Sequence, residues 1–321
     1  MNRYPAVILA AGRGNRMGEL GNRVPKPLLP VGHEPIIGHQ LRMLHALGVR
    51  EAHVVVGHRA PDVVRFLGDG SAYGIELRYV EQTEQLGIAH AVGTLRRMLT
   101  TPFLLLLGDY FFIAEDPARL VRRLDQGHSA QLTKREADPR RISESCELRV
   151  GEHGLVTSLI EKPMRPRGEL KGCGFYALQP EICDYIARTP RTALRDEYEF
   201  TLTLDLFVKD GNPLHAETMS VWDHNFTYPF DVLDCNITWL QNQRLRAFVA
   251  QSAIVGADVE LDNVVIGGNA HVAGNARLRD VVVFPGARVE AGETIQESLA
   301  TPHGIVRATR RDARMPAGSV A

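Results

Sequence analysis

An apolar period of six residues near the C-terminal end constrains the fold more than any other feature of this chain. Apolar side chains recur at that interval at Ile266, Val272, Leu278 and Phe284. After a shift of one residue, the spacing continues at Val283, Val289 and Ile295. Helices repeat every 3.6 residues and strands every 2.0, so neither explains the pattern. Such a period is typical of a hexapeptide β-helix, and the segment has room for about two or three coils.

The first half of the chain alternates short apolar runs with amphipathic patterns. Continuous apolar runs, which suit strands buried on both faces, occupy residues 6–10, 54–56 and 103–107. Apolar residues at helical spacing fill residues 36–47, 61–67 and 88–99. This alternation predicts an α/β fold, with a Rossmann-like, mostly parallel sheet and helices on both faces.

These patterns divide the chain into four segments. The α/β domain is expected over residues 1–229, with a looser extension for substrate contacts in its second half. A connecting helix is expected over 230–250, the β-helix over 251–300, and a loosely held polar tail over 301–321. Because the coils are few, we expect them to pack or to self-associate, which favours a homo-oligomer.

Charge and cysteine content exclude several classes of protein. The 321 residues include 37 lysines and arginines and 38 aspartates and glutamates, so the formal net charge is −1. This balance gives no reason to expect nucleic acid or a membrane surface as a partner. The four cysteines form no CxxC pair, which favours buried free thiols over a zinc or redox motif. Neither a signal-peptide core nor a membrane-spanning stretch is predicted, and a cytoplasmic location is expected.

A glycine-rich turn directly follows the first predicted strand. It contains Gly12, Gly14 and Arg16, and a Pro-Lys-Pro segment centred on Lys26 comes next. Glycine lets the backbone approach a triphosphate closely, and the N–H groups of such a turn bind anions. Arg16 and Lys26 add positive charge for phosphate oxygens. The spacing fits neither a dinucleotide fingerprint nor a P-loop. From the glycines alone, a plain strand-to-helix turn with solvated arginines stays open.

Several ordered motifs make the chain resemble the sugar nucleotidylyltransferase family. They occupy residues 12–16, 25–30, 79–91, 107–109, 161–163, 196–201 and 228–236. The chain is most similar to the long-form glucose-1-phosphate thymidylyltransferases, which carry a short left-handed β-helix at the C-terminus. The resemblance implies a transferase of nucleotide-sugar biosynthesis. Such an enzyme joins a nucleoside triphosphate to a sugar 1-phosphate and releases pyrophosphate.

The resemblance also implies a role for each matched residue. Nucleotide contacts fall on Ala10, Ala11, Gly12, Gly14, Gln82 and Gly87. The catalytic cations are Arg16, Lys26 and Lys162. Sugar contacts fall on Gly174 and Glu199. The alternatives are an exposed loop glutamine at 82, a surface ion pair between 161 and 162, and a first-turn helix carboxylate at 199.

One carboxylate stands out as a metal ligand. Asp109 closes the apolar run at 103–107, and the carboxyl edge of a parallel sheet is where ligands bind. Mg²⁺ takes few protein oxygens and completes its shell with phosphates and water, so it is the expected cofactor. A helix N-cap is the alternative role for Asp109. The family's second metal-binding aspartate is matched by Asn225, which lacks the charge. Asp223 could substitute for it if the loop shifts.

Departures from the family pattern leave two functions open. Residues 199–202 end in leucine instead of aspartate, and residues 142–146 lack the aromatic–glycine pair. One possibility is an active enzyme with an unusual phosphosugar-like acceptor and dTTP or UTP as the favoured triphosphate. The other is a weakened homologue that binds nucleotide or nucleotide-sugar as a regulatory or partner subunit. Activity is favoured because Arg16, Lys26, Asp109 and Lys162 are all present. A hexapeptide acyltransferase is disfavoured, since the predicted coils are few and contain only His271.

Overall fold

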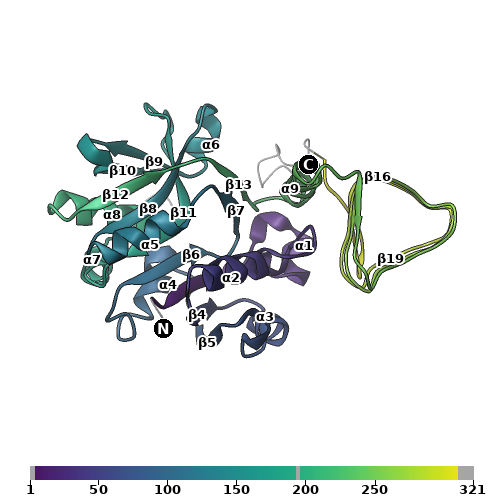
Figure 1. The fold of residues 1–321 in the computed structure, drawn as a ribbon, viewed down its shortest axis with the longest axis horizontal. Helices are drawn as coiled ribbons and strands as arrows, with labels where there is room; N and C mark the ends of the chain where they lie inside the picture. Colours follow the sequence, from purple (N-terminus) through teal and green to yellow (C-terminus); the bar gives the residue numbers. More distant parts are fainter. Residues whose placement is uncertain (1–3, 193–195, 310–321) are drawn as a thin grey trace. The chain divides into compact units, whose positions relative to one another are not determined.

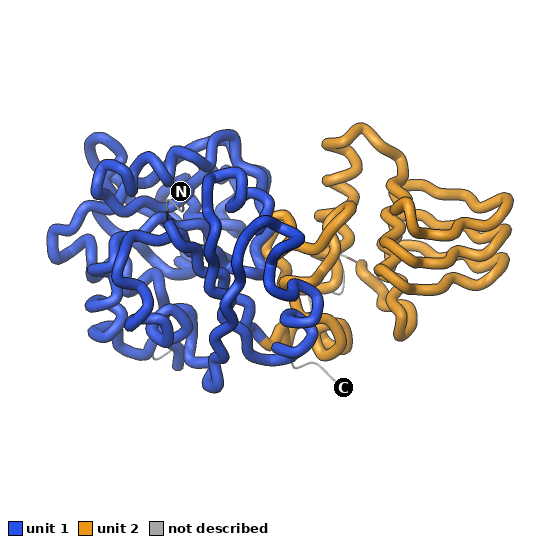
Figure 2. Tube along the Cα trace, turned by 60° about the horizontal axis from the view of Figure 1, so that its bottom comes forward, with its two compact units in different colours: residues 1–12, 40–223 blue, residues 13–39, 224–321 orange. Residues whose placement is uncertain are grey.

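The computed structural model describes residues 4–192 and 196–309. The chain forms two compact units, coloured separately in Figure 2. Unit 1 comprises Met1–Gly12 and Gln40–Asp223, and unit 2 comprises Arg13–His39 and His224–Ala321. The sequence predicted one continuous domain over 1–229. In the structure, residues 13–39 instead cluster with the C-terminal segments.

A nine-stranded sheet forms the centre of unit 1 (Figure 1). Its parallel part has the order β6-β1-β4-β5 and consists of β1 (Ala6–Ala10), β4 (Glu51–Val56), β5 (Glu76–Glu81) and β6 (Phe103–Leu107). The other strands are β8 (Ser129–Arg135), β9 (Cys146–Val150), β10 (Val156–Glu161), β11 (Leu170–Leu178) and β12 (Leu214–Thr218). β11 is antiparallel to β6, β8 and β9, whereas β12 and β8 are parallel. The mixed α/β class with a large sheet agrees with the prediction.

Helices of unit 1 supply the apolar side chains that cover the sheet. They are α2 (Ile36–Ala46, whose first residues belong to unit 2), α3 (Ala60–Leu67), α4 (Ile88–Gly93), α5 (Ala118–Asp125), α6 (Pro139–Ser143), α7 (Ile182–Arg188) and α8 (Phe200–Lys209), with 3-10 turns η3 (Ser71–Tyr73) and η4 (Glu152–Gly154). One cluster joins Val92 of α4 and Leu204 of α8 to Leu105 of β6. Such burial of apolar surface is the main force that holds helices on a sheet. A separate two-stranded sheet pairs β7 (Tyr110–Ala114) with β13 (Val221–Asn225).

In unit 2, the segment 13–39 packs against a long helix. The segment contains η1 (Asn15–Met17), α1 (Glu19–Arg23), η2 (Lys26–Leu28), β2 (Pro30–Val31) and β3 (Glu34–Pro35), and the helix is α9 (Pro229–Asn242). The buried Asn236 side chain accepts a hydrogen bond from Gly32 N at 2.8 Å and donates one to Pro30 O at 2.8 Å. A Cβ on Gly32 would lie 2.4 Å from the Trp239 ring, so only glycine fits in this turn. These contacts attach the β2–β3 turn to α9.

The C-terminal strands wind into a parallel coil, whose three-sided outline is visible in Figure 1. They are β14 (Ala247–Val249), β15 (Ile254–Val255), β16 (Glu260–Ile266), β17 (His271–Val272), β18 (Arg277–Val283), β19 (Arg288–Val289) and β20 (Thr294–Thr301). Paired residues lie 17 positions apart, as in Val264 with Val281 and Val281 with Ser298. A turn of the coil is therefore two six-residue sides and one five-residue side. The shorter side explains the one-residue shift in the apolar period.

The corners of the coil repeat at the same interval. Left-handed backbone recurs in three columns, at Asp258, Asn275 and Gly292, at Asn263, Asp280 and Glu297, and at Asn269 and Gly286. Glycine, asparagine and aspartate tolerate this conformation best, which accounts for most of these residues. Asn263 Nδ2 also donates to Asp280 Oδ1 at 2.9 Å, linking one corner to the next.

The C-terminal boundaries differ from the prediction. The helix expected over 230–250 ends at Asn242, because residues 247–249 pair with β16 as the first strand of the coil. The tail expected from residue 301 is wrong for its first part, since β21 (Gly304–Arg307) pairs antiparallel with β20. The rest of that tail, 310–321, lies outside the described residues. The prediction of buried free thiols is confirmed for Cys146, Cys173, Cys183 and Cys235. Within 4–192 and 196–309, every helix is too short or too polar to cross a bilayer.

Candidate functional site

The carboxyl ends of the parallel strands gather several predicted site residues on one edge of unit 1. Along this edge, Asp109 follows β6, Ala10 ends β1 and is followed by Ala11, and Gln82 follows β5. Between them lies Gly57, directly after β4. Ligands of open α/β sheets bind at this edge, so the topology alone brings a carboxylate, two alanines and an amide to a favourable place.

Ala11 is closely surrounded by backbone. A Cβ on Gly57 would lie 2.9 Å from Ala11 O, so the neighbouring loop must have glycine there. On another side, Gln85 Nε2 donates to Ala11 O at 2.5 Å. The loop after β5 is thereby held to the end of β1. Gly12 follows with no atom within 4 Å of its Cβ position, which leaves room for a ligand's approach.

Gln82 is buried rather than an exposed loop residue, since only 6% of its surface is accessible. Its backbone N–H donates to Val56 O at 2.7 Å. Its side-chain amide lies 3.0 Å from His90 Nδ1, so Nε2 donates and the ring nitrogen accepts. The carbonyl end of the same amide is the part that can still accept a hydrogen bond from a base. The alternative of a solvated loop glutamine is therefore wrong.

Position 87 requires glycine because of its backbone conformation and its close contact with Tyr198. It caps α4 with φ 104° and ψ 174°, a conformation that residues with a Cβ rarely adopt. A Cβ would lie 2.6 Å from Tyr198 O. Tyr198 N also donates to Leu86 O at 2.7 Å, so the segment before α8 is tied to the start of α4. This close contact is with Tyr198; contact with a nucleobase stays a prediction.

Replacing Gly87 with alanine is expected to lower the free energy of unfolding by about 1–3 kcal/mol through backbone strain alone. The contact with Tyr198 O should increase that loss. Gly211→Ala is the matched control, because Gly211 has φ 88° and no atom within 4 Å of its Cβ position. Urea unfolding of the two variants measures the difference. Equal losses would show that the contact with Tyr198 carries no weight.

Lys162 lies on the loop after β10 in an unusual backbone conformation. Its φ is 41°, which costs a lysine about 1–2 kcal/mol relative to ordinary backbone. Its N–H donates to Ser145 O at 2.8 Å, which fixes the loop, and its side chain is 34% exposed. The distance from its Nζ to Glu161 Oε1 is 4.0 Å, at the outer limit of an ion pair. Strained backbone is found preferentially at functional sites, so this geometry favours the phosphate-binding role over a simple surface pair.

Hydrogen bonds connect the Lys162 loop to the same sheet edge. Ser145 Oγ donates to Gly172 O of β11 at 2.9 Å. Two residues further along β11, a Cβ on Gly174 would lie 3.0 Å from the Tyr110 ring and 3.1 Å from Leu107 Cβ. Leu107 ends β6 immediately before Gly108 and Asp109. Gly174 therefore packs tightly beside the strand that presents Asp109.

Glu199 and Glu161 flank the start of α8. Glu199 is buried at the N-cap position, but its side chain makes no capping hydrogen bond to the helix. Its charge nevertheless lies at the N-terminus of α8, as the alternative of a helix-start carboxylate requires, and the sugar contact of Glu199 stays a prediction. Two residues later, Thr201 Oγ1 donates to Glu161 Oε2 at 2.6 Å. Because Tyr198 contacts Gly87, residues 198–201 connect the predicted nucleotide side of unit 1 with the Glu161–Lys162 loop.

In unit 2, the glycine turn and the Pro-Lys-Pro segment lie together. Gly14 has left-handed backbone with φ 67° and ψ 33°, and its Cβ position is 3.3 Å from Lys26 Cε and Cγ. Gly21 packs as closely, since a Cβ there would lie 2.5 Å from Gly14 O. Arg16 is exposed on η1, two residues after Gly14. An exposed guanidinium and a lysine beside a glycine turn are suited to a polyphosphate.

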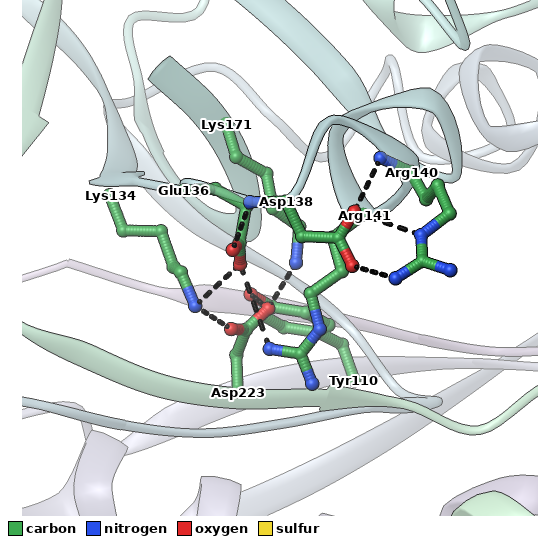
Figure 3. A network of polar contacts seen from close by, with 8 residues as sticks. All are labelled: Tyr110, Lys134, Glu136, Asp138, Arg140, Arg141, Lys171 and Asp223. Atoms are coloured by element: carbon green, nitrogen blue, oxygen red, sulfur yellow. Dashed lines mark hydrogen bonds and ion pairs between the residues drawn. The ribbon is translucent and has the colours of Figure 1, made fainter. Parts of the chain in front are cut away.

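The predicted metal residues differ in environment. Asn225 is exposed at the end of β13, where its side chain offers a neutral oxygen. Asp223 is 3% exposed, and its Oδ1 accepts from Lys134 Nζ at 2.6 Å. Its Oδ2 accepts from Lys171 Nζ and from the Tyr110 hydroxyl, the latter at 2.7 Å (Figure 3). The alternative that Asp223 serves as the second metal ligand is wrong, because this carboxylate already belongs to a buried ion network.

Charge balance in this network sets the protonation of Asp223. Burial alone would raise the pKa of the carboxyl group, but the charges and hydrogen bonds of Lys171 and Lys134 outweigh it and hold the pKa well below its usual range. Burial would lower the pKa of Lys134, but hydrogen bonds and charges from Asp223 and Glu136 raise it instead. Both groups are therefore charged at neutral pH, and the network fixes β13 against β8 and β11.

Sequence reasoning missed three residues that organise this edge. Gln85 holds the loop to Ala11, Tyr198 fills the space beside Gly87, and Glu161 accepts from Thr201. All three lie inside the motifs that carry the resemblance. Their contacts are with residues 40 to 111 positions away in the chain, so no local spacing revealed their roles.

Comparison with known proteins places the chain in one class. Residues 5–229 match a family described as nucleotidyl transferase. The chain is 30% identical over 261 residues to the low-salt glycan biosynthesis nucleotidyltransferase of Haloferax volcanii, covering 79% of this chain and 72% of that protein. It is 31% identical over 226 residues to the UTP–glucose-1-phosphate uridylyltransferase of the same organism. That match covers 70% of this chain and 92% of the relative. It is 27% identical over 302 residues to the glucose-1-phosphate thymidylyltransferase of Streptomyces antibioticus, covering 92% and 81%.

Solved structures share the fold. A Bacillus anthracis protein, provisionally named a glucose-1-phosphate thymidylyltransferase and solved with sucrose, superposes with a TM-score of 0.66 at 25% identity. The match covers 74% of this chain and 95% of that one. A UDP-glucose pyrophosphorylase complexed with UDP-glucose gives a TM-score of 0.65 at 19% identity. The match covers 75% of this chain and 100% of that one, and at this identity it shows a shared fold alone.

Proposed function

The chain belongs to the nucleotidyl transferase family, and from that premise we propose that it transfers a nucleotidyl group to a sugar 1-phosphate or a sugar-like phosphate. The triphosphate that we favour is dTTP or UTP, and the products are the nucleotide-sugar and pyrophosphate. The relatives named above as uridylyl- and thymidylyltransferases support this choice of base.

The observation that carries the proposal is the carboxyl edge of the unit 1 sheet. It presents Asp109, Ala11 and the buried Gln82 after the parallel strands β6, β1 and β5. The strained Lys162 loop is hydrogen-bonded, through Ser145, to the strand beside them. Gln82 follows β5 and Lys162 follows β10, the two strands at opposite ends of the strand order. An amide that can hydrogen-bond a base and a lysine that can bind a phosphate suit a substrate that has a base, a phosphate chain and a sugar.

In the proposed reaction, a phosphate oxygen of the sugar phosphate attacks the α-phosphorus of the triphosphate. The bond between the α-phosphorus and its bridging oxygen breaks, and pyrophosphate leaves. Lys162 binds the attacking phosphate, while Arg16 and Lys26 bind the triphosphate and neutralise the charge that develops on the leaving group. Gln82 orients the base through its carbonyl oxygen.

The donor set fits one Mg²⁺ ion. Asp109 is a half-buried carboxylate at a strand end, and Mg²⁺ needs only one or two such oxygens in addition to phosphates and water. When bound, the ion would neutralise phosphate oxygens, with Asn225 as a weaker neutral ligand. Because Asp223 is committed to its lysines, no second carboxylate compensates from β13.

The uncharged Asn225 favours a second candidate function. A homologue with a weakened metal site could bind nucleotide or nucleotide-sugar and act as a regulatory or partner subunit. Self-association through the coil likewise stays a prediction.

Mg²⁺-dependent pyrophosphate release separates the two candidates. The full chain is incubated with each nucleoside triphosphate and a panel of sugar 1-phosphates. Release with dTTP or UTP and one sugar phosphate supports the transferase. Nucleotide binding by calorimetry, without release for any pair, supports the regulatory subunit. Asn225→Asp is the informative variant, because the added carboxylate should raise the affinity of the site for Mg²⁺ under either candidate function.

A further inference from the structure

Two histidines and a glutamate converge in unit 2, and none of them is among the residues assigned above to nucleotide transfer. His33 lies in the turn between β2 and β3, Glu34 begins β3, and His39 lies in the first part of α2. One ligand atom from each residue lies within 4.8 Å of the other two. Among the described residues, no other group of three such side chains converges in this way.

The distances suit a metal ion. His33 Nε2 lies 3.3 Å from Glu34 Oε1, and His39 Nδ1 lies 3.8 Å from the same oxygen. A tetrahedral ion with bonds of about 2.0–2.2 Å separates its ligand atoms by roughly 3.4 Å. The third separation, between a ring nitrogen of His33 and one of His39, is at most 4.8 Å. A movement of the exposed His33 side chain by up to about 1.4 Å would therefore bring all three ligand atoms to tetrahedral spacing and leave one position for water.

Hydrogen bonding already prepares His39 for this role. Its Nε2 lies 2.8 Å from Val31 O, and because a carbonyl only accepts, Nε2 carries the proton. In the neutral ring, the lone pair then lies on Nδ1, the atom that faces Glu34. Metal-binding histidines typically donate their second ring nitrogen to a carbonyl or carboxylate, which fixes both tautomer and ring orientation.

We propose that His33, Glu34 and His39 form a binding site for a divalent transition-metal cation of the zinc type, distinct from the Mg²⁺ of the transfer reaction. Two imidazoles and one carboxylate favour zinc, cobalt or nickel over Mg²⁺, which prefers oxygen alone. Such an ion links the β2–β3 turn to α2. Because Gly32 and Asn236 attach that turn to α9, the ion also rigidifies the packing within unit 2.

Titration of the chelator-treated full chain with Co²⁺ tests the proposal without nucleotide or sugar phosphate. We expect one Co²⁺ per chain, the visible absorption of a tetrahedral site, and displacement by Zn²⁺ but not by excess Mg²⁺. The His33 ring centroid is 6.1 Å from that of Trp239, so Co²⁺ should also quench Trp239 fluorescence. Failure of this titration leaves the pyrophosphate assay unaffected, so the two proposals fail separately.

Three variants and one control decide the assignment. His33→Ala, His39→Ala and Glu34→Gln should each weaken binding at least about 10- to 100-fold, the loss seen when even an outer partner of a metal ligand is removed. His303→Ala removes an exposed histidine of unit 2 and should bind as the wild type does. His33 is itself exposed, so His33→Ala keeps the test valid if His39→Ala fails to fold. Equal affinity in the His33 and control variants, or no saturable site in the wild type, overturns the proposal.

Discussion

Lys171→Met is expected to lower the free energy of unfolding by about 3–5 kcal/mol, the loss that follows when one partner of a buried ion pair is removed. Lys171 is 4% exposed and donates to Asp223, which is 3% exposed. Methionine fills a similar volume but leaves the carboxylate with a single lysine. Lys134 and the Tyr110 hydroxyl remain, so the loss should lie toward the lower end.

The matched control for this variant is Lys209→Met. Lys209 pairs with Asp205 at 2.7 Å, but its side chain is 62% exposed, so its loss should cost at most about 1 kcal/mol. Urea unfolding at neutral pH measures both variants. A Lys171→Met loss no larger than that of the control contradicts the structural role assigned to the network.

The pH dependence provides an independent signature of the same network. The pKa of Asp223 is lowered in the folded chain, so its contribution to stability is present above the unfolded pKa of about 3.9 and is lost as the pH falls below it. The difference between wild type and Lys171→Met should be constant above about pH 5 and shrink on acidification. A packing effect alone would not follow this titration.

Lys162→Met is expected to lower kcat/KM for pyrophosphate release by about 100- to 1,000-fold, the effect of removing one well-placed charged donor, or about 2.7–4 kcal/mol. The backbone N–H of Lys162 donates to Ser145 O, which holds the residue in a left-handed conformation, and its side chain is 34% exposed. Measurement of kcat and KM at saturating Mg²⁺ tests this, with Lys209→Met as the charge-matched control.

A second substitution separates catalysis from structure at the same position. Lys162→Gly removes the ammonium group but relieves a φ of 41°, which glycine adopts without strain. Activity should fall as in Lys162→Met, while the free energy of unfolding should be unchanged or slightly higher. If both activity and stability fell together, the lysine would act through the fold instead of through the substrate.

The fold was predictable where local pattern dominates. The apolar runs at 6–10 and 103–107 became β1 and β6 with the expected bounds, because strands covered on both faces leave a continuous signal. The six-residue period identified the coil, but the 17-residue turn was visible only as a one-residue shift. The end of α9 at Asn242 was missed, since the pairing of residues 247–249 with β16 is tertiary.

The positions of the candidate site residues were predictable from sequence motifs, but the polar contacts between distant side chains were not. The sequence predicts that Asp109 closes the apolar run at 103–107, and in the structure it follows β6. It could not show that Asp223 belongs to lysines 52 and 89 positions away. Nor did it indicate His33, Glu34 and His39, whose convergence depends on a tight turn and on the rotation of α2. Long-range polar contacts carry no periodic signal, so they emerge only from coordinates.

The antiparallel return of β21 onto β20 has a consequence for solubility. A stack of identical parallel rungs presents backbone N–H and C=O groups at its end, and a second molecule can extend such a stack indefinitely. The final strand reverses direction and covers part of that end through four paired positions, from Ser298 with Arg307 to Thr301 with Gly304. Chains that lack this strand should therefore be more prone to grow into fibrils from the exposed rung.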